Sequence, residues 1–288
     1  MTFRDDADIG SGRTSKRGKM ALGGGLGLVA ALLVGQLLGV DLTGFLGGSS
    51  TPADDQALEH CQTGADANAD IECRMVGASA SIDAYWEGAA SQLGVDYSPP
   101  TGGLVLFTEA VQTGCGGASS TTGPFYCPLD ATIYIDVSFF QSLRDRFGAN
   151  EGPLAELYVV AHEWGHHMQN LTGILEETRD GETGPTSNAV RVELQADCFA
   201  GSWAAAASTV TDESGVAFLE PITDAQIRDA LSAAAAVGDD RIQESSGGQV
   251  TPHSFTHGTS EQRQKWFLAG FGGGAGACDT FSVSGSEL

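Results

Sequence analysis

The residues best suited to chemistry are His162, Glu163 and His166, which form the sequence His-Glu-Trp-Gly-His in a chain of 288 residues. Two histidines four positions apart lie one turn apart on the same face of a helix, so both imidazoles can bind one metal ion. Glu163, displaced by one position, can reach a water on that ion without being a ligand. The three residues therefore predict a zinc hydrolase site with a carboxylate base over an open coordination position.

The surrounding residues decide whether this short motif, which also occurs by chance, has the helix that it needs. Leu154 and residues 157–161 are apolar at helical spacing, Pro153 suits a first helical turn, and Gly173 offers a stop. The motif is therefore expected in the middle of a buried helix. The adjacent His167 points elsewhere and is expected to support the site or to lie at the surface rather than to bind the metal.

A catalytic zinc ion usually has three protein ligands, and Glu193 is the best candidate for the third. Residues 188–201 also read as a helix, with Asn188 as its N-cap. Asp197 follows Glu193 by one turn and could accept the outward N–H of a ligating imidazole. The alternative is an ordinary pair of solvated acidic side chains.

The segment with Glu193 and Asp197, placed after the first motif, resembles the glutamate-zincin metallopeptidases. Four phrases are more similar still to the bacterial putative neutral zinc metallopeptidase family: residues 123–136, 162–170, 193–201 and 255–263. The resemblance runs from the apolar segment before Asp41 to Cys278, with Trp164 where a smaller aliphatic residue is expected. It implies an α+β, zincin-like domain on a membrane anchor.

Zincin-like enzymes place a sheet edge beside the metal helix, where an extended peptide can add as a strand. Residues 104–108 and 132–136 read as strands, residues 114–123 as a loop, and residues 222–237 as a structural helix. We expect residues 126–136 to form that edge, with Tyr134 and Ile135 contacting substrate. The alternative is an interior strand.

The last candidate is His257, six positions before Arg263 at the expected start of a helix. This spacing resembles a His-Pro-x-x-x-x-Arg phrase of membrane-associated zinc peptidases that process prenylated proteins, in which the histidine helps to stabilise the oxyanion. Gly258 stands in place of the proline. The resemblance implies a catalytic role for His257, and the alternative is a histidine that caps the helix. His253 is a weaker candidate for the same role.

The N-terminal part of the chain predicts an anchor. Residues 1–19 are polar and expected to be disordered in the cytoplasm. Residues 20–40 contain no charge and would form a helix about 32 Å long, against a hydrocarbon core of about 30 Å. Arg13, Lys16, Arg17 and Lys19 directly precede them, which places residues 41–288 outside the cytoplasm, with 41–55 as linker and 56–288 as the metallopeptidase domain. A cleaved signal peptide is the alternative, although no A-x-A-like site follows.

The six cysteines agree with an exterior domain. The simplest connectivity joins Cys61 to Cys73, Cys115 to Cys127 and Cys198 to Cys278. Free thiols in a reducing compartment are the alternative. A cysteine zinc site is not expected, because no C-x-x-C pair is present.

The part of the chain after the anchor has nine Lys and Arg residues against 34 Asp and Glu residues, a formal charge of about −25. Such a charge repels nucleic acid. The expected partners are a peptide or protein substrate and the membrane. The residues and the resemblance together predict a metallopeptidase that uses a zinc-activated water with Glu163 as general base. Two alternatives are a metal-stabilised module that binds envelope proteins without catalysis, and a hydrolase of non-peptide amides.

Overall fold

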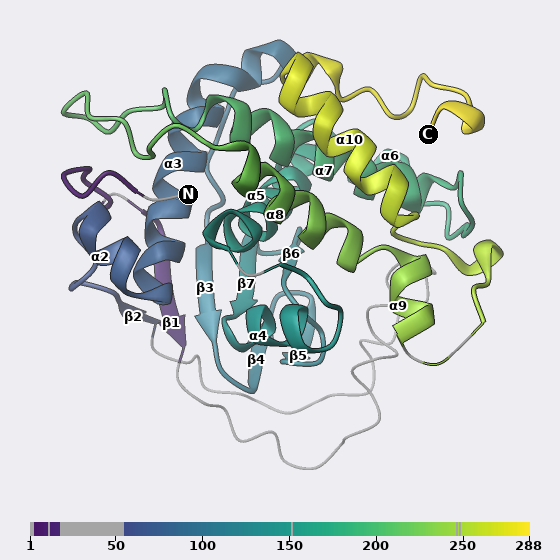
Figure 1. Cartoon of the computed structure of the whole chain (residues 1–288), viewed down its shortest axis with the longest axis horizontal. Helices are drawn as coiled ribbons and strands as arrows, with labels where there is room; N and C mark the ends of the chain where they lie inside the picture. Colours follow the sequence, from purple (N-terminus) through teal and green to yellow (C-terminus); the bar gives the residue numbers. More distant parts are fainter. Residues whose placement is uncertain (1–2, 11, 18–54, 151, 246, 248) are drawn as a thin grey trace.

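The computed structural model of the protein describes residues 3–10, 12–17, 55–150, 152–245, 247 and 249–288 (Figure 1). The apolar stretch at residues 20–40, predicted to span a membrane, lies outside these residues. Within the described part of the chain, no helix is both long enough and apolar enough to cross a membrane.

The main sheet is five-stranded, in the order β2-β1-β3-β7-β6. Its strands are β1 (Thr14–Arg17), β2 (Asp55–Ala57), β3 (Gly103–Phe107), β6 (Phe125–Cys127) and β7 (Thr132–Asp136). The three central strands, β1, β3 and β7, are parallel, and β2 and β6 are antiparallel strands at the two edges. Together with the helices, this sheet confirms the predicted α+β class.

The two faces of the sheet are covered differently, because side chains alternate along a strand. Leu104 and Ile135 belong to the main core beneath the helices. Val105 and Tyr134 belong to a second cluster with the hairpin of β4 (Ala110–Thr113) and β5 (Gly116–Ser119). The expectation that residues 114–123 form only a loop is therefore wrong, because β5 lies within them.

The helices lie largely on one side of this sheet (Figure 1). Their bounds are α2 Gly64–Ala69, α3 Ile71–Ala89, α4 Ser138–Asp145, α5 Pro153–Leu171, α6 Ile174–Glu177, α7 Asn188–Ala206, α8 Asp224–Ala236, α9 Asp239–Ser245 and α10 Ser260–Gly273. Single 3-10 turns occur at Ala90–Leu93, Pro252–Ser254, Ala275–Ala277 and Gly285–Glu287. Helix α7 packs between α5 and α10, which brings three distant parts of the sequence together.

The ends of the helices follow their sequence signals. Helix α5 begins at Pro153, as predicted. Helix α7 is capped by Ser187, whose hydroxyl accepts from the amide of Val190, so the expected cap at Asn188 is one residue late. Helix α10 begins with a capping box formed by Thr259 and Gln262. Thr259 is therefore the cap of this helix, and His257 is not.

The N-terminal residues are folded, which corrects the expectation that residues 1–19 are disordered for the part that is described. Phe3, Ala7 and Ile9 are buried in the main core. The amide of Asp8 donates to Asp212 at 2.8 Å, and β1 lies inside the sheet between β2 and β3. Three buried apolar side chains and the interior strand β1 attach this mostly polar segment to the domain. Amino-acid composition alone predicts neither the burial nor the strand.

Strands β1 and β2 flank residues 18–54 and pair with each other. The described residues on either side, Arg17 and Asp55, are therefore partners in the sheet. A cytoplasmic N-terminus with an exterior domain would require residues 3–17 to lie across a membrane from helices α5 and α7. In the structure, Phe3, Ala7 and Ile9 instead share one core with these two helices.

The edge beside α5, the helix that carries His162 and His166, is β6. The prediction that residues 126–136 form this edge therefore holds for Tyr126 and Cys127 and is wrong for residues 132–136. Strand β7 is paired on both sides, with β3 and with β6, so its backbone is not available to a peptide. Tyr134 and Ile135 are 1% and 0% exposed. The ring of Tyr134 stacks on Phe125 at 5.1 Å, on the face away from the main core. Neither residue is placed to contact substrate.

Candidate metal site

Helices α5 and α7 bring together the three residues predicted to bind metal. Nε2 of His162 lies 3.2 Å from Oε2 of Glu193, and Nε2 of His166 lies 3.5 Å from Oε1 of the same carboxylate. Each residue offers one ligand atom, and these atoms all lie within 4.8 Å of one another. Three side chains from two helices thus converge on one point.

The spacing of these atoms fits a zinc ion. Two atoms that each lie about 2.0–2.1 Å from a tetrahedral centre are about 3.3–3.4 Å apart. Each imidazole nitrogen lies near this distance from one oxygen of Glu193, 3.2 Å from Oε2 for His162 and 3.5 Å from Oε1 for His166. Two imidazole nitrogens and one carboxylate oxygen are also a donor set of catalytic rather than structural zinc sites.

A glycine within the motif allows the two helices to approach. A Cβ atom at Gly165 would lie 2.9 Å from the Cα atom of Ala196, closer than real Cβ contacts. Gly165 directly precedes His166, and Ala196 lies between Glu193 and Asp197. A larger residue at position 165 would therefore push the helix with Glu193 away from the histidines.

The outward nitrogen of His162 contacts Asp197, as predicted. Nδ1 of His162 lies 2.9 Å from Oδ1 of Asp197, which is fully buried. Arg263 donates to both oxygens of this carboxylate at 2.7 and 2.9 Å, and the hydroxyl of Tyr158 also donates to it. A carboxylate only accepts, so Nδ1 carries the proton and Nε2 presents its lone pair to the metal position. The parts played by Tyr158 and Arg263 were not predicted.

The outward nitrogen of His166 contacts an amide that the sequence reasoning missed. Nδ1 of His166 lies 2.8 Å from Oε1 of Gln169, which is fully buried. The spacing of three positions places the two side chains on one face of α5. That spacing, with a polar residue near the end of an apolar helix, was a signal that could have identified Gln169.

Glu163 differs from the other carboxylates of the site. It is 7% exposed, and burial raises the pKa of its carboxyl. Burial also acts on Glu193, but electrostatic attraction to the imidazoles of His166 and His257 outweighs it and holds the pKa of Glu193 well below its usual range. Two acidic groups whose pKa values are pushed apart suit two roles, an ionised ligand and a carrier of protons.

His162 is also shifted by its surroundings. Burial lowers the pKa of His162, and the carboxylate of Asp197 outweighs this and raises the pKa to about 10. A zinc ion bound at Nε2 would take the place of the additional proton.

His257 lies in the loop before α10, within electrostatic reach of Glu193. Its side chain is 41% exposed, and its Nδ1 lies 3.2 Å from Oδ1 of Asp239. Oδ2 of Asp239 accepts the backbone amides of Thr256, His257 and Gly258 at 2.7, 2.6 and 3.0 Å. Asp239, which was not predicted, therefore shapes the loop and orients the imidazole.

Gly258 explains why this loop departs from the His-Pro phrase that it resembles. Its φ angle is +84°, whereas proline is restricted to about −65°. A proline at this position could not adopt the same backbone. The comparison with that phrase therefore extends to His257 and Arg263 but not to the path of the chain between them.

His167, expected to support the site or lie at the surface, is 2% exposed and connects the metal helix to the sheet edge. Its Nε2 lies 2.7 Å from the carbonyl of Ser98, and its Nδ1 lies 3.0 Å from the hydroxyl of Tyr126 on β6. Asn170 donates to the same hydroxyl at 3.0 Å. Burial lowers the pKa of His167, which favours its neutral imidazole.

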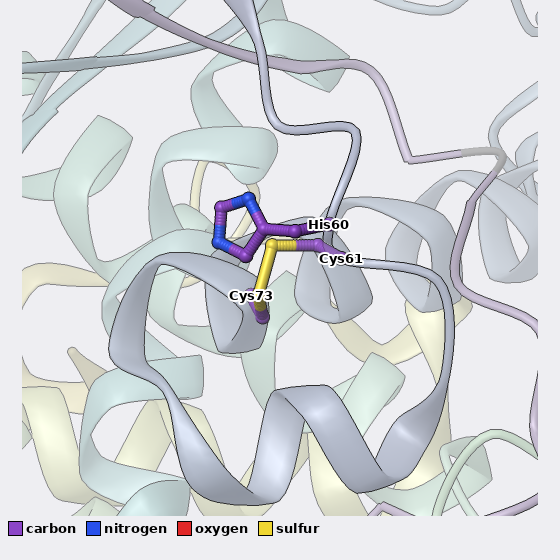
Figure 2. A group of neighbouring side chains, drawn as sticks. All are labelled: His60, Cys61 and Cys73. Carbon is purple, nitrogen blue, oxygen red and sulfur yellow. A yellow bond between two sulfur atoms is a disulfide. The ribbon is translucent and has the colours of Figure 1, made fainter.

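A second group of potential ligands, His60, Cys61 and Cys73, is closed to metal (Figure 2). The two sulfurs form a disulfide, so neither is a thiolate. The disulfides Cys115–Cys127 and Cys198–Cys278 are also present, which confirms all three predicted pairs.

Known proteins match nearly the whole of this chain. It is 51% identical over 257 residues to the uncharacterized protein Rv2575 of Mycobacterium tuberculosis (strain H37Rv), which covers 86% of this chain and 85% of the relative. It is 40% identical over 267 residues to the uncharacterized protein YpfJ of Escherichia coli (strain K12), which covers 91% and 88%. No solved structure shows a significant match. The profile of the family described as putative neutral zinc metallopeptidase matches residues 3–281, so the chain belongs to that family.

Proposed function

We propose that the protein is a zinc-dependent metallopeptidase. The observation that supports this most is the convergence of His162, His166 and Glu193, whose ligand atoms lie within 4.8 Å of one another, with Glu163 beside them. An ion held only for stability would not need a buried carboxyl in that position. Bound there, zinc would lower the pKa of a water molecule and polarise the carbonyl to be attacked.

In the proposed reaction, the side chains of the protein move the proton and meet the developing charge. Glu163 takes a proton from the attacking water and passes it to the leaving amine, a task that suits a carboxyl whose pKa is raised by burial. His257, protonated on both ring nitrogens, donates a hydrogen bond from Nε2 to the carbonyl oxygen as negative charge builds on it. Burial lowers the pKa of His257, and the carboxylates of Glu193 and Asp239 outweigh this and raise it, which favours the doubly protonated ring. Asp239 accepts at Nδ1 and so keeps the donor side of the ring directed away from the loop.

We propose that the substrate is an extended peptide that adds to the outer edge of β6. Within the described sheet, β6 pairs with β7 alone. Tyr126 of β6 is held to the metal helix by His167 and Asn170, so the edge and the metal position keep a constant separation. Backbone hydrogen bonds to a free strand edge bind peptides largely without regard to side-chain type.

We also propose that the domain works outside the cytoplasm and is attached to a membrane through residues 20–40. The three disulfides support an oxidising compartment. Because residues 3–17 share the core of the domain, we place them on the same side of the membrane as the metal site. The charge of about −25 carried by residues 41–288 favours a protein or peptide substrate over nucleic acid.

The test is a Glu163→Gln substitution in the full-length protein loaded with zinc. Both proteins should bind about one zinc per chain, because the ligands remain. Cleavage of a mixed peptide library, read by mass spectrometry, should fall by orders of magnitude in the variant. Glu176→Gln, an exposed change on α6, is the control and should cleave like the parent protein. Equal cleavage by Glu163→Gln would exclude this mechanism, and a zinc-loaded parent that cleaves nothing would favour a non-catalytic binding role.

A further inference from the structure

The imidazole of His166 stands at the start of a chain of hydrogen bonds that leads away from the metal position. Nδ1 of His166 contacts Oε1 of Gln169 at 2.8 Å. Nε2 of Gln169 donates to Oε1 of Gln195 at 3.1 Å, and Nε2 of Gln195 donates to the carbonyl of Cys278 at 2.9 Å. The chain thus connects α5, α7 and the C-terminal tail.

The direction of this chain is decided at its far end. A backbone carbonyl can only accept, so Gln195 must turn its NH₂ group toward Cys278 and its oxygen toward Gln169. Gln169 must then turn its own NH₂ group toward Gln195. A second carbonyl, that of Val192 at 2.6 Å, requires the same orientation of Gln169 independently.

The orientation of Gln169 determines which nitrogen of His166 carries a proton. Because Gln169 presents its oxygen to His166, Nδ1 of the imidazole must carry a proton, and in the neutral ring that binds metal Nε2 then carries the lone pair that faces Glu193. Gln169 and Gln195 are 0% and 5% exposed, so water does not compete for these bonds. The opposite tautomer would place two acceptors against each other in the core, at the cost of an unsatisfied buried group.

We propose that Gln169 and Gln195, ending on the carbonyl of Cys278, are positioning residues that hold His166 in its metal-binding tautomer. The inference rests on the proposed zinc site and goes beyond it, because it assigns a role to the C-terminal tail. That tail is held against α7 by the Cys198–Cys278 disulfide and by Thr280, whose hydroxyl donates to the carbonyl of Arg191 at 2.8 Å.

An amide chain also suits the charge of the site. His162 is oriented by a carboxylate, Asp197, and the guanidinium of Arg263 compensates that charge. No described cation contacts Gln169, so a second carboxylate there would add an uncompensated buried charge. A neutral acceptor fixes the tautomer of His166 without that charge.

The experiment uses the full-length protein and two measurements that do not depend on turnover. The first is the ¹⁵N chemical shift of the His166 imidazole in metal-free protein, which distinguishes the two tautomers. The second is zinc affinity, measured by competition with a chromophoric chelator. Gln169→Met removes the acceptor at similar volume, and Gln195→Met removes the second step of the chain.

We expect the Nδ1–H tautomer in the parent protein and a mixture of tautomers in Gln169→Met. Zinc affinity should fall about 10–100-fold in Gln169→Met and in the same direction, by less, in Gln195→Met. Phe199→Leu is the control for stability. Phe199 lies on α7 but packs on Trp86 of α3, so this variant should melt earlier and bind zinc like the parent.

His162→Ala separates failure of this inference from failure of the zinc site. If His162→Ala loses zinc while Gln169→Met keeps the parent affinity and tautomer, the positioning role is wrong and the zinc site stands. If His162→Ala binds zinc like the parent, the proposed site itself is wrong, and the inference falls with it.

Discussion

The two histidine ligands present the same nitrogen to the metal position but are oriented by chemically different groups. Asp197, neutralised by Arg263, accepts from His162, and the amide of Gln169 accepts from His166. A third imidazole, His257, is oriented by Asp239 at the rim of the site. In each case the acceptor contacts Nδ1 of the imidazole and leaves Nε2 for the metal position or the substrate.

At the residue scale we predict that His257→Ala keeps its zinc and loses turnover. One hydrogen bond to a developing oxyanion contributes about 10²–10³ in kcat, with little change in KM, because the bond strengthens only as charge builds. The measurement is steady-state cleavage of a peptide found in the library. His253→Ala, an exposed histidine in a neighbouring turn, is the control.

Asp239→Asn should lower kcat less than His257→Ala does, and should also lower the melting temperature. Its carboxylate accepts three backbone amides as well as contacting the imidazole, so the loop is weakened with the ring. A His257→Ala protein with the kcat of the parent would show that this histidine only packs in the loop.

At the scale of elements, α5 is held on several sides, and each contact starts from a residue in or next to the motif. Gly165 admits α7, and His167 binds β6 through Tyr126. Trp164 is fully buried, and its Nε1 donates to the hydroxyl of Tyr97 at 2.8 Å. Tyr97 in turn donates to Asp83 on α3. The bulky Trp164 thus connects the metal helix to α3.

Asp83 makes this connection sensitive to pH. Burial raises the pKa of Asp83 to about 6, against a smaller opposing effect of the bond from Tyr97. An acid whose pKa is raised by folding binds its proton more tightly in the folded state, so its protonated form favours folding. The contribution of Asp83 to the free energy of unfolding is therefore fully present below its unfolded pKa of 3.8 and is lost as the pH rises through about 6. The native state is therefore disfavoured by the ionised Asp83 at neutral pH.

We predict that Asp83→Asn stabilises the protein at pH 7.5 and not at pH 4. The amide keeps an acceptor for Tyr97 and removes the buried charge, whereas the lost ion pair with Arg13, at 3.8 Å and with an exposed arginine, is weak. The gain in the free energy of unfolding should be on the order of 1–3 kcal/mol, a few degrees in melting temperature. Thermal unfolding at both pH values measures it. A gain that is equal at both would contradict the assignment.

At the scale of the whole molecule, the N-terminus and the metal site belong to one folded unit. Strand β1 lies inside the sheet, and Phe3 packs in the same core as α5. Arg17 and Asp55, the described residues on either side of segment 18–54, are partners on the paired strands β1 and β2. Any membrane attachment through that segment must therefore leave residues 3–17 and the metal site on one side.

We predict that Asp6→Cys and Glu213→Cys react alike with a membrane-impermeant maleimide on intact cells. Both positions are exposed, one in the N-terminal segment and one in the domain, and the native cysteines in the described part are all in disulfides. Labelling of both would also support an exterior location. Labelling of Glu213→Cys alone would show that β1 does not join the domain in the cell.

The sequence by itself determined the features that depend on local geometry. Four-residue spacing on a helix places His162 and His166 together, and the same spacing relates Glu193 to Asp197. Disulfides between cysteines twelve positions apart can be predicted without knowledge of the fold, and both local pairs are present. The α+β class and the bounds of α5 and β7 follow from the same kind of short-range pattern.

Only the tertiary structure decided the features that depend on which distant segments become neighbours. The order of the strands makes β6 rather than β7 the edge, and it draws the polar N-terminus into the sheet. Contacts between segments distant in sequence bring Arg263 to Asp197, Asp239 to His257, and Gln169 to Cys278 by way of Gln195. Polar side chains such as these look like solvated surface in the sequence, because their partners are acquired only when helices pack and the burial that makes them specific is a property of the whole core.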